Sequence, residues 1–248
     1  EGEAVITISS GDLPADVSAT LFDAGVTKTS DAFYSYPIDE SLNPTFFPGV
    51  YTLQEKMTSA AVLTALENPA NKMEHSAALP EGLTVEQSLT RIAEGLGMPI
   101  EDLQAAVADP AVYGVTAASL EGWLFPATYT FDPGTTATEI IQTLVNRTRE
   151  SLDAAQVPVD DRQRILTIAS IIQREARYTE DFYKVSRVIE NRMQPDNQET
   201  FGKLEMDSTA QYGYGEMHDG TAGSSAEALA DDNLWNTYVH TGLPVGPI

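Results

Sequence analysis

One glutamate stands in a predicted helix at a position where a charged side chain is unexpected. The segment reads DDRQRILTIASIIQREAR and spans residues 160–177. At about 100° per residue, Glu175 falls between the directions of Ile168 and Ile171, inside the apolar stripe. A carboxylate on a buried face is costly unless it is paired or neutralised, so burial would favour a protonated carboxyl. Such a group can act as a general acid, and this is the role we predict for Glu175.

Two other arrangements of Glu175 stay open at this level. The side chain lies near the expected end of its helix, so it could swing to solvent or pair with an arginine. The same helical wheel puts Thr167 and Ser170 on the polar side, and Asp160 and Asp161 are expected to cap the first turn. The apolar side is expected to comprise Ile165, Ile168, Ala169, Ile171, Ile172 and Ala176.

Other catalytic chemistries find little support in the composition. The chain has no cysteine, which excludes thiolate zinc sites and cysteine nucleophiles. Its three histidines, His75, His218 and His240, are far apart and form no ligand pair. No Gly-x-Ser-x-Gly elbow and no phosphate-cradling loop is present. We therefore expect no metal and no organic cofactor in catalysis.

The charge of the chain restricts its partners. The 37 acidic and 14 basic residues give a formal net charge of −23 over 248 residues. Nucleic-acid binding requires basic side chains that displace counterions, and docking on anionic lipid requires them as well. A glycan remains compatible with this charge. The alternative is that the charge serves only solubility.

The pattern of elements predicts an α+β fold. A β-branched strand at Val5–Ile8 precedes a helix at residues 16–24, and a similar strand-turn-helix unit returns at residues 79–96. We predict further helices at residues 58–66, 101–107, 137–155 and 180–193, and an extended segment at 124–131. The strand-and-helix region is expected to span residues 1–115, and a mainly helical region residues 116–248.

Five blocks in the second half carry a family resemblance. They read LEGWLFPATYTF, ASIIQREA, VSRVIENRM, LEMDSTAQYGYG and NTYVHTGLPVGPI, in this order. Together they resemble the endolytic murein transglycosylases of the MltG (YceG-like) family over residues 119–248. FFPGVYTL and LPEGLTVEQ match the N-terminal half more loosely. There the resemblance implies a LysM-like glycan-binding module at about residues 77–114, although a plain structural αβ unit is the alternative.

The resemblance implies an activity and a site. The family cleaves MurNAc-β-1,4-GlcNAc bonds inside peptidoglycan strands and leaves 1,6-anhydroMurNAc ends, which terminates or trims nascent strands. Its catalytic glutamate corresponds to Glu175; many members have another glutamate where this chain has Gln173. The site-lining positions implied by the resemblance are Glu121, Asn191, Asp207, Thr209, Gln211, Tyr212, Asn236 and Tyr238.

The resemblance also implies surroundings in the cell. A single-pass membrane anchor is expected N-terminal to this sequence, with this domain on the extracytoplasmic face. Peptidoglycan strands are the expected partner, together with cell-wall synthesis enzymes such as penicillin-binding proteins. The family continues beyond the position of Ile248, so part of a substrate groove is expected outside this sequence.

Two alternatives to a lytic transglycosylase remain. One is a non-catalytic peptidoglycan-binding or scaffold protein of the cell envelope, which would place Glu175 at the surface. The other is a glycoside hydrolase with two carboxylates about 5–9.5 Å apart. A lytic transglycosylase needs a single carboxyl, because the C6 hydroxyl of the same sugar attacks C1 and no water takes part.

Overall fold

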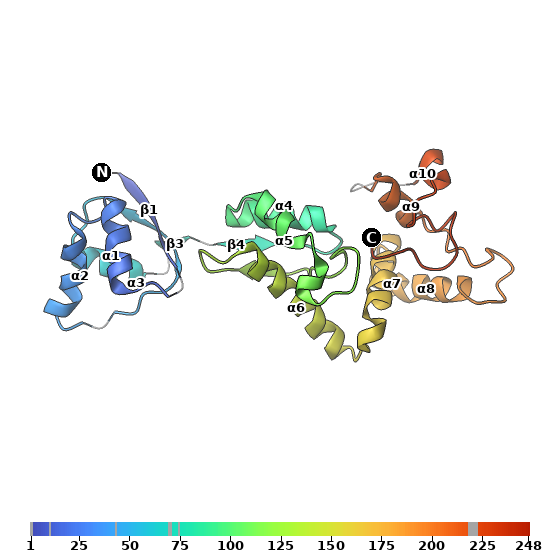
Figure 1. Cartoon of the computed structure of the whole chain (residues 1–248), viewed down its shortest axis with the longest axis horizontal. Helices are drawn as coiled ribbons and strands as arrows, with labels where there is room; N and C mark the ends of the chain where they lie inside the picture. The colour runs from blue at the N-terminus through green and yellow to red at the C-terminus, as the bar shows by residue number, and fades with distance from the viewer. Residues whose placement is uncertain (1, 10, 43, 69–70, 74, 218–222) are drawn as a thin grey trace. The chain divides into compact units, whose positions relative to one another are not determined.

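The computed structural model describes residues 2–9, 11–42, 44–68, 71–73, 75–217 and 223–248 (Figure 1). His218 lies outside the described residues. The chain packs into two compact units. Unit 1 comprises Glu1–Ala78, Ile92–Met98 and Thr128–Ile140, and unit 2 comprises Leu79–Arg91, Pro99–Ala127 and Ile141–Ile248. The division into residues 1–115 and 116–248 stays a prediction.

Unit 1 contains an antiparallel sheet in the order β1-β2-β3. Its strands are β1 (Glu3–Ile8), β2 (Gly49–Gln54) and β3 (Lys72–Met73). In β1, Ala4, Ile6 and Ile8 are buried while the residues between them are exposed, as the period of two in a strand requires. The register runs from Glu3 opposite Gln54 to Ile8 opposite Gly49. This strand was expected from its β-branched residues.

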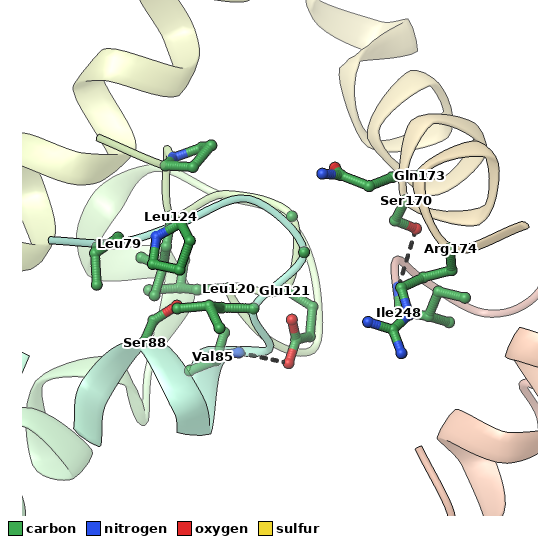
Figure 2. Close-up of a pocket in the computed structure, with 15 residues that line it drawn as sticks. Leu79, Val85, Ser88, Leu120, Glu121, Leu124, Ser170, Gln173, Arg174 and Ile248 are labelled. Atoms are coloured by element: carbon green, nitrogen blue, oxygen red, sulfur yellow. Dashed lines mark hydrogen bonds between the residues drawn. The ribbon is translucent and has the colours of Figure 1, made fainter. Parts of the chain in front are cut away.

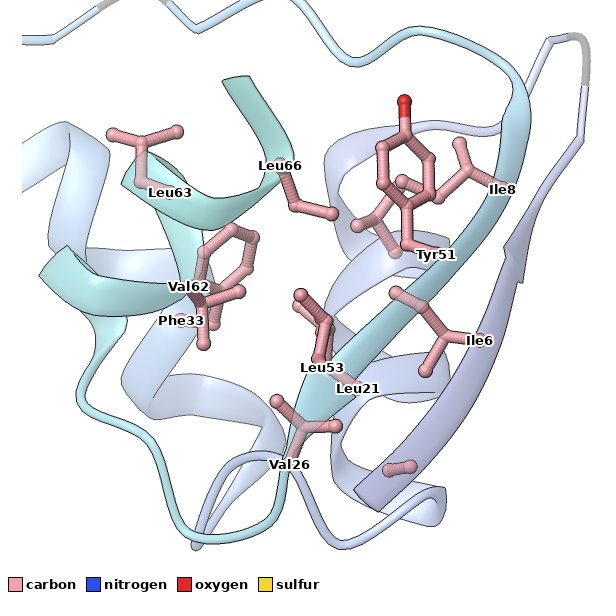
Figure 3. Close-up of a cluster of buried hydrophobic side chains, with 12 residues drawn as sticks. Ile6, Ile8, Leu21, Val26, Phe33, Tyr51, Leu53, Val62, Leu63 and Leu66 are labelled. Atoms are coloured by element: carbon pink, nitrogen blue, oxygen red, sulfur yellow. The ribbon is translucent and has the colours of Figure 1, made fainter. Parts of the chain in front are cut away.

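Three helices contribute to the core of unit 1. They are α1 (Pro14–Asp23), α2 (Ser30–Asp39) and α3 (Ser59–Glu67). Leu21 of α1, Phe33 of α2 and Val62 of α3 pack with the buried face of β1 and β2 (Figure 3). The spacing of apolar residues did not predict α2, which contains Pro37. Proline disfavours helix interiors, but here burial of Phe33 and a Thr29 cap support the helix.

A second small sheet also belongs to unit 1. Strand β4 (Ser76–Ala78) pairs antiparallel with β5 (Thr128–Thr130). The segments between them in sequence include α4 (Val85–Leu96), α5 (Ile100–Val107) and a 3₁₀ turn at Pro110–Tyr113.

Unit 2 holds most of the remaining helical residues. The helices are α6 (Ala137–Ala154), which belongs to this unit from Ile141 onward, α7 (Arg162–Glu175), α8 (Thr179–Arg192), α9 (Asp207–Tyr214) and α10 (Ala226–Ala230), with a 3₁₀ turn at Val159–Asp161. Ile171 of α7, Ile189 of α8 and Met206 before α9 form one hydrophobic cluster with Leu204 and Ile248. The predicted helices 137–155 and 180–193 are confirmed within two residues.

The structure confirms an α+β fold with small antiparallel sheets. Three details of the α7 prediction are wrong. Ala169, expected on the apolar side, is exposed. Thr167 is buried, although the wheel put it on the polar side, and its hydroxyl donates to the Gln163 carbonyl. Asp161 occupies the position before the helix without a side-chain cap hydrogen bond. None of the helices in the described ranges is long and apolar enough to cross a membrane.

Candidate active site

Glu175 is the last residue of α7, and its carboxyl binds the start of α9. Oε1 of Glu175 accepts hydrogen bonds from the Ser208 backbone N–H (3.0 Å) and the Ser208 hydroxyl (2.6 Å). The first N–H groups of a helix lack partners within it and carry partial positive charge. A carboxylate there is therefore stabilised by both hydrogen bonding and the helix dipole.

This arrangement differs from all three expectations for Glu175. The side chain is half-buried, and so is neither enclosed in the apolar stripe nor free in solvent. It is held by Ser208 rather than by an arginine. Within the described residues, both hydrogen bonds to this carboxyl end on Oε1. The direction of Oε2 is then fixed by the Ser208 contacts.

Asp207 and Tyr238 form a second polar pair beside Ser208. The Tyr238 hydroxyl donates to Oδ1 of Asp207 at 2.6 Å. Burial raises the pKa of Tyr238, and the hydrogen bond to Asp207 and the negative charges of Asp207, Glu175 and Glu205 raise it further. The phenol therefore stays protonated around neutral pH. Two of the expected site residues thus lie within the electrostatic reach of Glu175.

Thr209 and Asn236, also expected to line the site, are fully buried and support the backbone instead. The hydroxyls of Thr209 and Thr237 are 2.7 Å apart, and the Thr237 hydroxyl accepts from the Met206 N–H at 3.1 Å. These contacts join the segment that begins α9 to the loop that carries Tyr238.

Asn236 organises this loop. Its Nδ2 donates to the carbonyls of Ala228, Leu229 and Asp231 at 2.7–3.2 Å, and its Oδ1 accepts from the Tyr238 N–H at 2.9 Å. The first two carbonyls belong to α10, whose last carbonyls have no partner within the helix. Asn236 therefore acts as a structural residue that fixes the position of Tyr238.

Glu121 is a buried carboxyl at the start of another helix. Its Oε1 accepts from the Val85 N–H, the first of α4, at 2.9 Å, and the Tyr212 hydroxyl also donates to it. Burial raises the pKa of Glu121, while the bonds from Val85 and Tyr212 partly oppose this. Tyr212 and Ser208 are four residues apart on α9 and so share one face. That face of α9 binds two carboxyls, Glu121 and Glu175.

Glu121 also lines a cavity of about 100 Å³. Figure 2 shows Glu121 on one side of it, with Ser170, Gln173 and Arg174 of α7 on the other. The backbone N–H of Ile248 donates to the Ser170 hydroxyl at 3.0 Å. Glu175 is not among the residues lining this cavity, although three of its neighbours on α7 are.

The two remaining expected residues are less closely linked to Glu175. Asn191 lies exposed on α8, and Gln211 is buried on α9. The contacts of the described residues do not join Asn191 to Glu175. Sequence reasoning missed Ser208, even though it lies between Asp207 and Thr209 in the block that carried the resemblance. The helix α9, in whose first turn Ser208 lies, was itself not predicted.

Titration of Glu121 gives a prediction for stability. Because the pKa of Glu121 is raised on folding, folding favours its protonated form, and stability is lost as pH rises through the folded-state pKa. Glutamine at this position cannot ionise, yet it can accept from Val85 and donate to the Tyr212 oxygen. We expect the free energy of unfolding of Glu121→Gln to fall less than that of the wild type between about pH 4.5 and about pH 8.

Urea denaturation across this pH range measures the difference. Glu190→Gln, at an exposed glutamate of α8, is the matched control and should follow the wild type. Parallel pH profiles for the wild type and Glu121→Gln would contradict the raised pKa.

The described part of the chain contains no group of three or more His, Cys, Asp or Glu side chains able to hold a metal ion. Catalysis without a metal or organic cofactor stays a prediction.

Comparisons with known proteins agree on one family. The YceG-like family profile matches residues 6–248. An endolytic murein transglycosylase of Bacillus subtilis is 27% identical over 98% of this chain and 71% of its own length. Proteins of the same name from two Streptococcus pneumoniae strains are 25% identical over 98% of this chain, which spans about half of their length, 49%.

A solved structure supports the same assignment. The crystal structure of a putative yceG-like protein from Listeria monocytogenes matches 99% of this chain and 85% of its own, with 26% identity and a TM-score of 0.57. The family match covers nearly all of the sequence, including Glu175, Ser208 and Tyr238. The chain therefore belongs to the YceG-like family.

Proposed function

We propose that this chain is the peptidoglycan-cleaving part of an endolytic lytic transglycosylase, with Glu175 as its acid/base. The observation that carries the proposal is the carboxyl of Glu175, whose Oε1 accepts hydrogen bonds from the N–H and the hydroxyl of Ser208; we assign the transferable proton to Oε2. The relatives named endolytic murein transglycosylases indicate murein as the substrate, and the bond we propose to be cut is the MurNAc-β-1,4-GlcNAc bond.

In the first half of the reaction, Glu175 acts as a general acid. The proton on Oε2 moves to the glycosidic oxygen as the bond from that oxygen to C1 of MurNAc breaks. The sugar passes through an oxocarbenium-like state, and GlcNAc leaves with a free hydroxyl. General acid catalysis of this kind contributes about 10²–10⁴ in rate.

In the second half, the Glu175 carboxylate acts as a base. It accepts the proton of the C6 hydroxyl while that oxygen bonds to C1 of the same MurNAc, which closes the 1,6-anhydro ring. The reaction returns Glu175 to its protonated form and consumes no water. Because nucleophile and electrophile belong to one sugar, proximity lowers the barrier, and a second catalytic carboxylate is not required.

Ser208 and the Asp207–Tyr238 pair support this chemistry. When Glu175 loses its proton, the Ser208 hydroxyl and N–H, both directed at Oε1, stabilise the new charge. The protonated Tyr238 phenol is oriented by Asp207 and is proposed to contact the sugar together with Asp207. We retain Glu121, Tyr212, Gln211 and Asn191 as proposed site-lining residues, whereas Thr209 and Asn236 act through the backbone.

A LysM-like glycan-binding module remains part of the proposal for the N-terminal half. Its support within residues 77–114 is the chain order β4, α4, α5. Strand β4 pairs antiparallel with β5, which follows this range. The order β1, α1, α2, β2 has the same form. Two such units would suit a protein that binds a repetitive polymer.

The wider setting of the protein is also proposed. A membrane anchor beyond this sequence would hold the domain on the extracytoplasmic face, close to nascent strands. Cell-wall synthesis enzymes, including penicillin-binding proteins, would then be partners.

Mass analysis of the products tests the function. Purified peptidoglycan is incubated with the protein, and the released strands are separated and weighed. We expect 1,6-anhydroMurNAc ends, which are one water lighter than reducing ends. Reducing ends would indicate the two-carboxylate hydrolase instead. Binding without any cleavage would indicate the scaffold.

A further inference from the structure

Unit 2 carries an aromatic groove that the proposed site does not use. It has a volume of about 470 Å³ and lies between α7, α8 and the segment before β5. Aromatic rings of Phe125, Phe182 and Tyr183 line it, and Glu81, Gln173 and Ser186 supply polar groups. The volume falls within the range of ligand-binding clefts, about 300–1,000 Å³.

Two of these rings are arranged as ligand platforms. Tyr183 is 82% exposed on α8, so its ring makes little contribution to the core and is available from solvent. The ring of Phe125 also contacts a cation, since the Arg147 guanidinium lies over it at 4.6 Å from the ring centroid. An aromatic ring supplies a large apolar face at low conformational cost.

We infer that this groove is a subsite for an uncharged N-acetylglucosamine ring of the glycan strand. A pyranose has one face of C–H groups, which packs on an aromatic ring, and a rim of hydroxyl and acetamido groups. The carboxylate of Glu81, the amide of Gln173 and the hydroxyl of Ser186 offer acceptors and donors for such a rim. The inference rests on the proposed function for the identity of the polymer.

The charge of the groove selects between the two sugars of peptidoglycan. Among the described residues that line it, Glu81 is the one that carries a charge. A MurNAc residue with its acidic stem peptide would meet like charge there. The neutral N-acetylglucosamine avoids this repulsion, as well as the penalty of burying unpaired carboxylates.

The groove adjoins the segment that carries Glu175. Gln173 and Pro126 line both the groove and the cavity of Figure 2, and Gln173 lies two residues before Glu175 on α7. An enzyme that cuts inside a strand gains from holding sugars beyond the reacting pair, because remote binding energy positions the reacting bond.

Binding of chitotetraose, an uncharged oligomer of N-acetylglucosamine, tests the subsite without any bond cleavage. Isothermal titration is carried out with the full chain and three variants. Tyr183→Ala should raise Kd about three- to tenfold, the range expected for loss of an aromatic contact. Tyr183→Phe keeps the ring and should stay within about twofold of the wild type. Phe201→Ala, at a ring 69% exposed outside the groove, is the matched control.

Several results would overturn the inference. One is that the wild type binds no chitotetraose at all, and another is that Tyr183→Ala leaves Kd unchanged. Equal losses of chitotetraose affinity in Tyr183→Ala and Tyr183→Phe would have the same consequence. Loss of self-association in Tyr183→Ala with unchanged sugar binding would also overturn it, because the groove would then serve a second copy.

The subsite and the proposed function fail in different ways. If the protein releases anhydro-ended products while Tyr183→Ala binds chitotetraose normally, the subsite is wrong and the function stands. If Tyr183→Ala loses chitotetraose affinity but the wild type releases no such products, the subsite stands and the function is wrong.

Discussion

Glu175→Gln is expected to abolish turnover on peptidoglycan while leaving the fold and glycan binding intact. The amide keeps the shape of the side chain, and its Oε1 can still accept from Ser208, but it has no transferable proton. We expect kcat to fall about 10²–10⁴-fold with little change in KM, because general acid catalysis acts only as the bond breaks. Release of anhydro-ended products from purified peptidoglycan measures the loss.

The comparison requires a wild-type protein shown to be active. Glu190→Gln is the matched control, since it changes an exposed glutamate of α8 in the same way. Circular dichroism and chitotetraose binding establish that each variant is folded. If Glu175→Gln kept more than about a tenth of the wild-type turnover, the loss would be smaller than that of any general acid. Glu121 and Asp207 would then be the next candidates.

Asn236→Ala is expected to cost about 3–5 kcal/mol in the free energy of unfolding. The side chain is fully buried and makes four hydrogen bonds to backbone groups. Alanine leaves the carbonyls of Ala228, Leu229 and Asp231 without their donor and the Tyr238 N–H without its acceptor. Each buried polar group left unpaired costs about 1–3 kcal/mol. Urea denaturation at neutral pH measures the change.

Asn191→Ala is the control for this measurement, because Asn191 is exposed on α8 and truncation there should change stability by less than about 0.5 kcal/mol. Asn236→Asp separates hydrogen bonding from volume. It keeps the size of the side chain but replaces the donor group with a second acceptor facing three carbonyls, so it should destabilise at least as much. A loss below about 1 kcal/mol in both variants at Asn236 would contradict a structural role.

The regular elements of this protein were largely predictable, because their signals are local. The apolar residues of α6, α7 and α8 recur at helical spacing, and β1 alternates at a period of two. Thr136 begins α6 with a cap that Glu139 completes through reciprocal hydrogen bonds, as the sequence T-A-T-E indicates. Helix α2 was not predictable because Pro37 lies in its interior. The helix is stabilised by the packing of Phe33 in the core rather than by the helix propensity of its residues.

The wheel of α7 failed for a different reason. It assumes that one face of the helix meets the core and the other meets water. In the structure, Ile171 faces the cluster with α8 and the α9 segment, while Thr167 on the supposed polar side is also buried. The Thr167 hydroxyl is tolerated in this buried position because it donates a hydrogen bond to the Gln163 carbonyl, one turn earlier. When a helix packs on more than one side, a single apolar stripe on the helical wheel does not predict which of its residues are buried.

The sequence alone determined that Glu175 occupies an unusual helical position within a block typical of this family, and which polar residues accompany it. Only the tertiary structure decided which groups each of them contacts. Glu175 meets Ser208 across 33 residues of chain, and Glu121 meets Val85 across 36. Thr209 and Asn236 are buried, and their side chains form hydrogen bonds with the Thr237 hydroxyl and with backbone groups. Hydrogen bonds are short and directional, so a role that depends on one is set by the packing of distant segments and leaves no signal in the residue spacing.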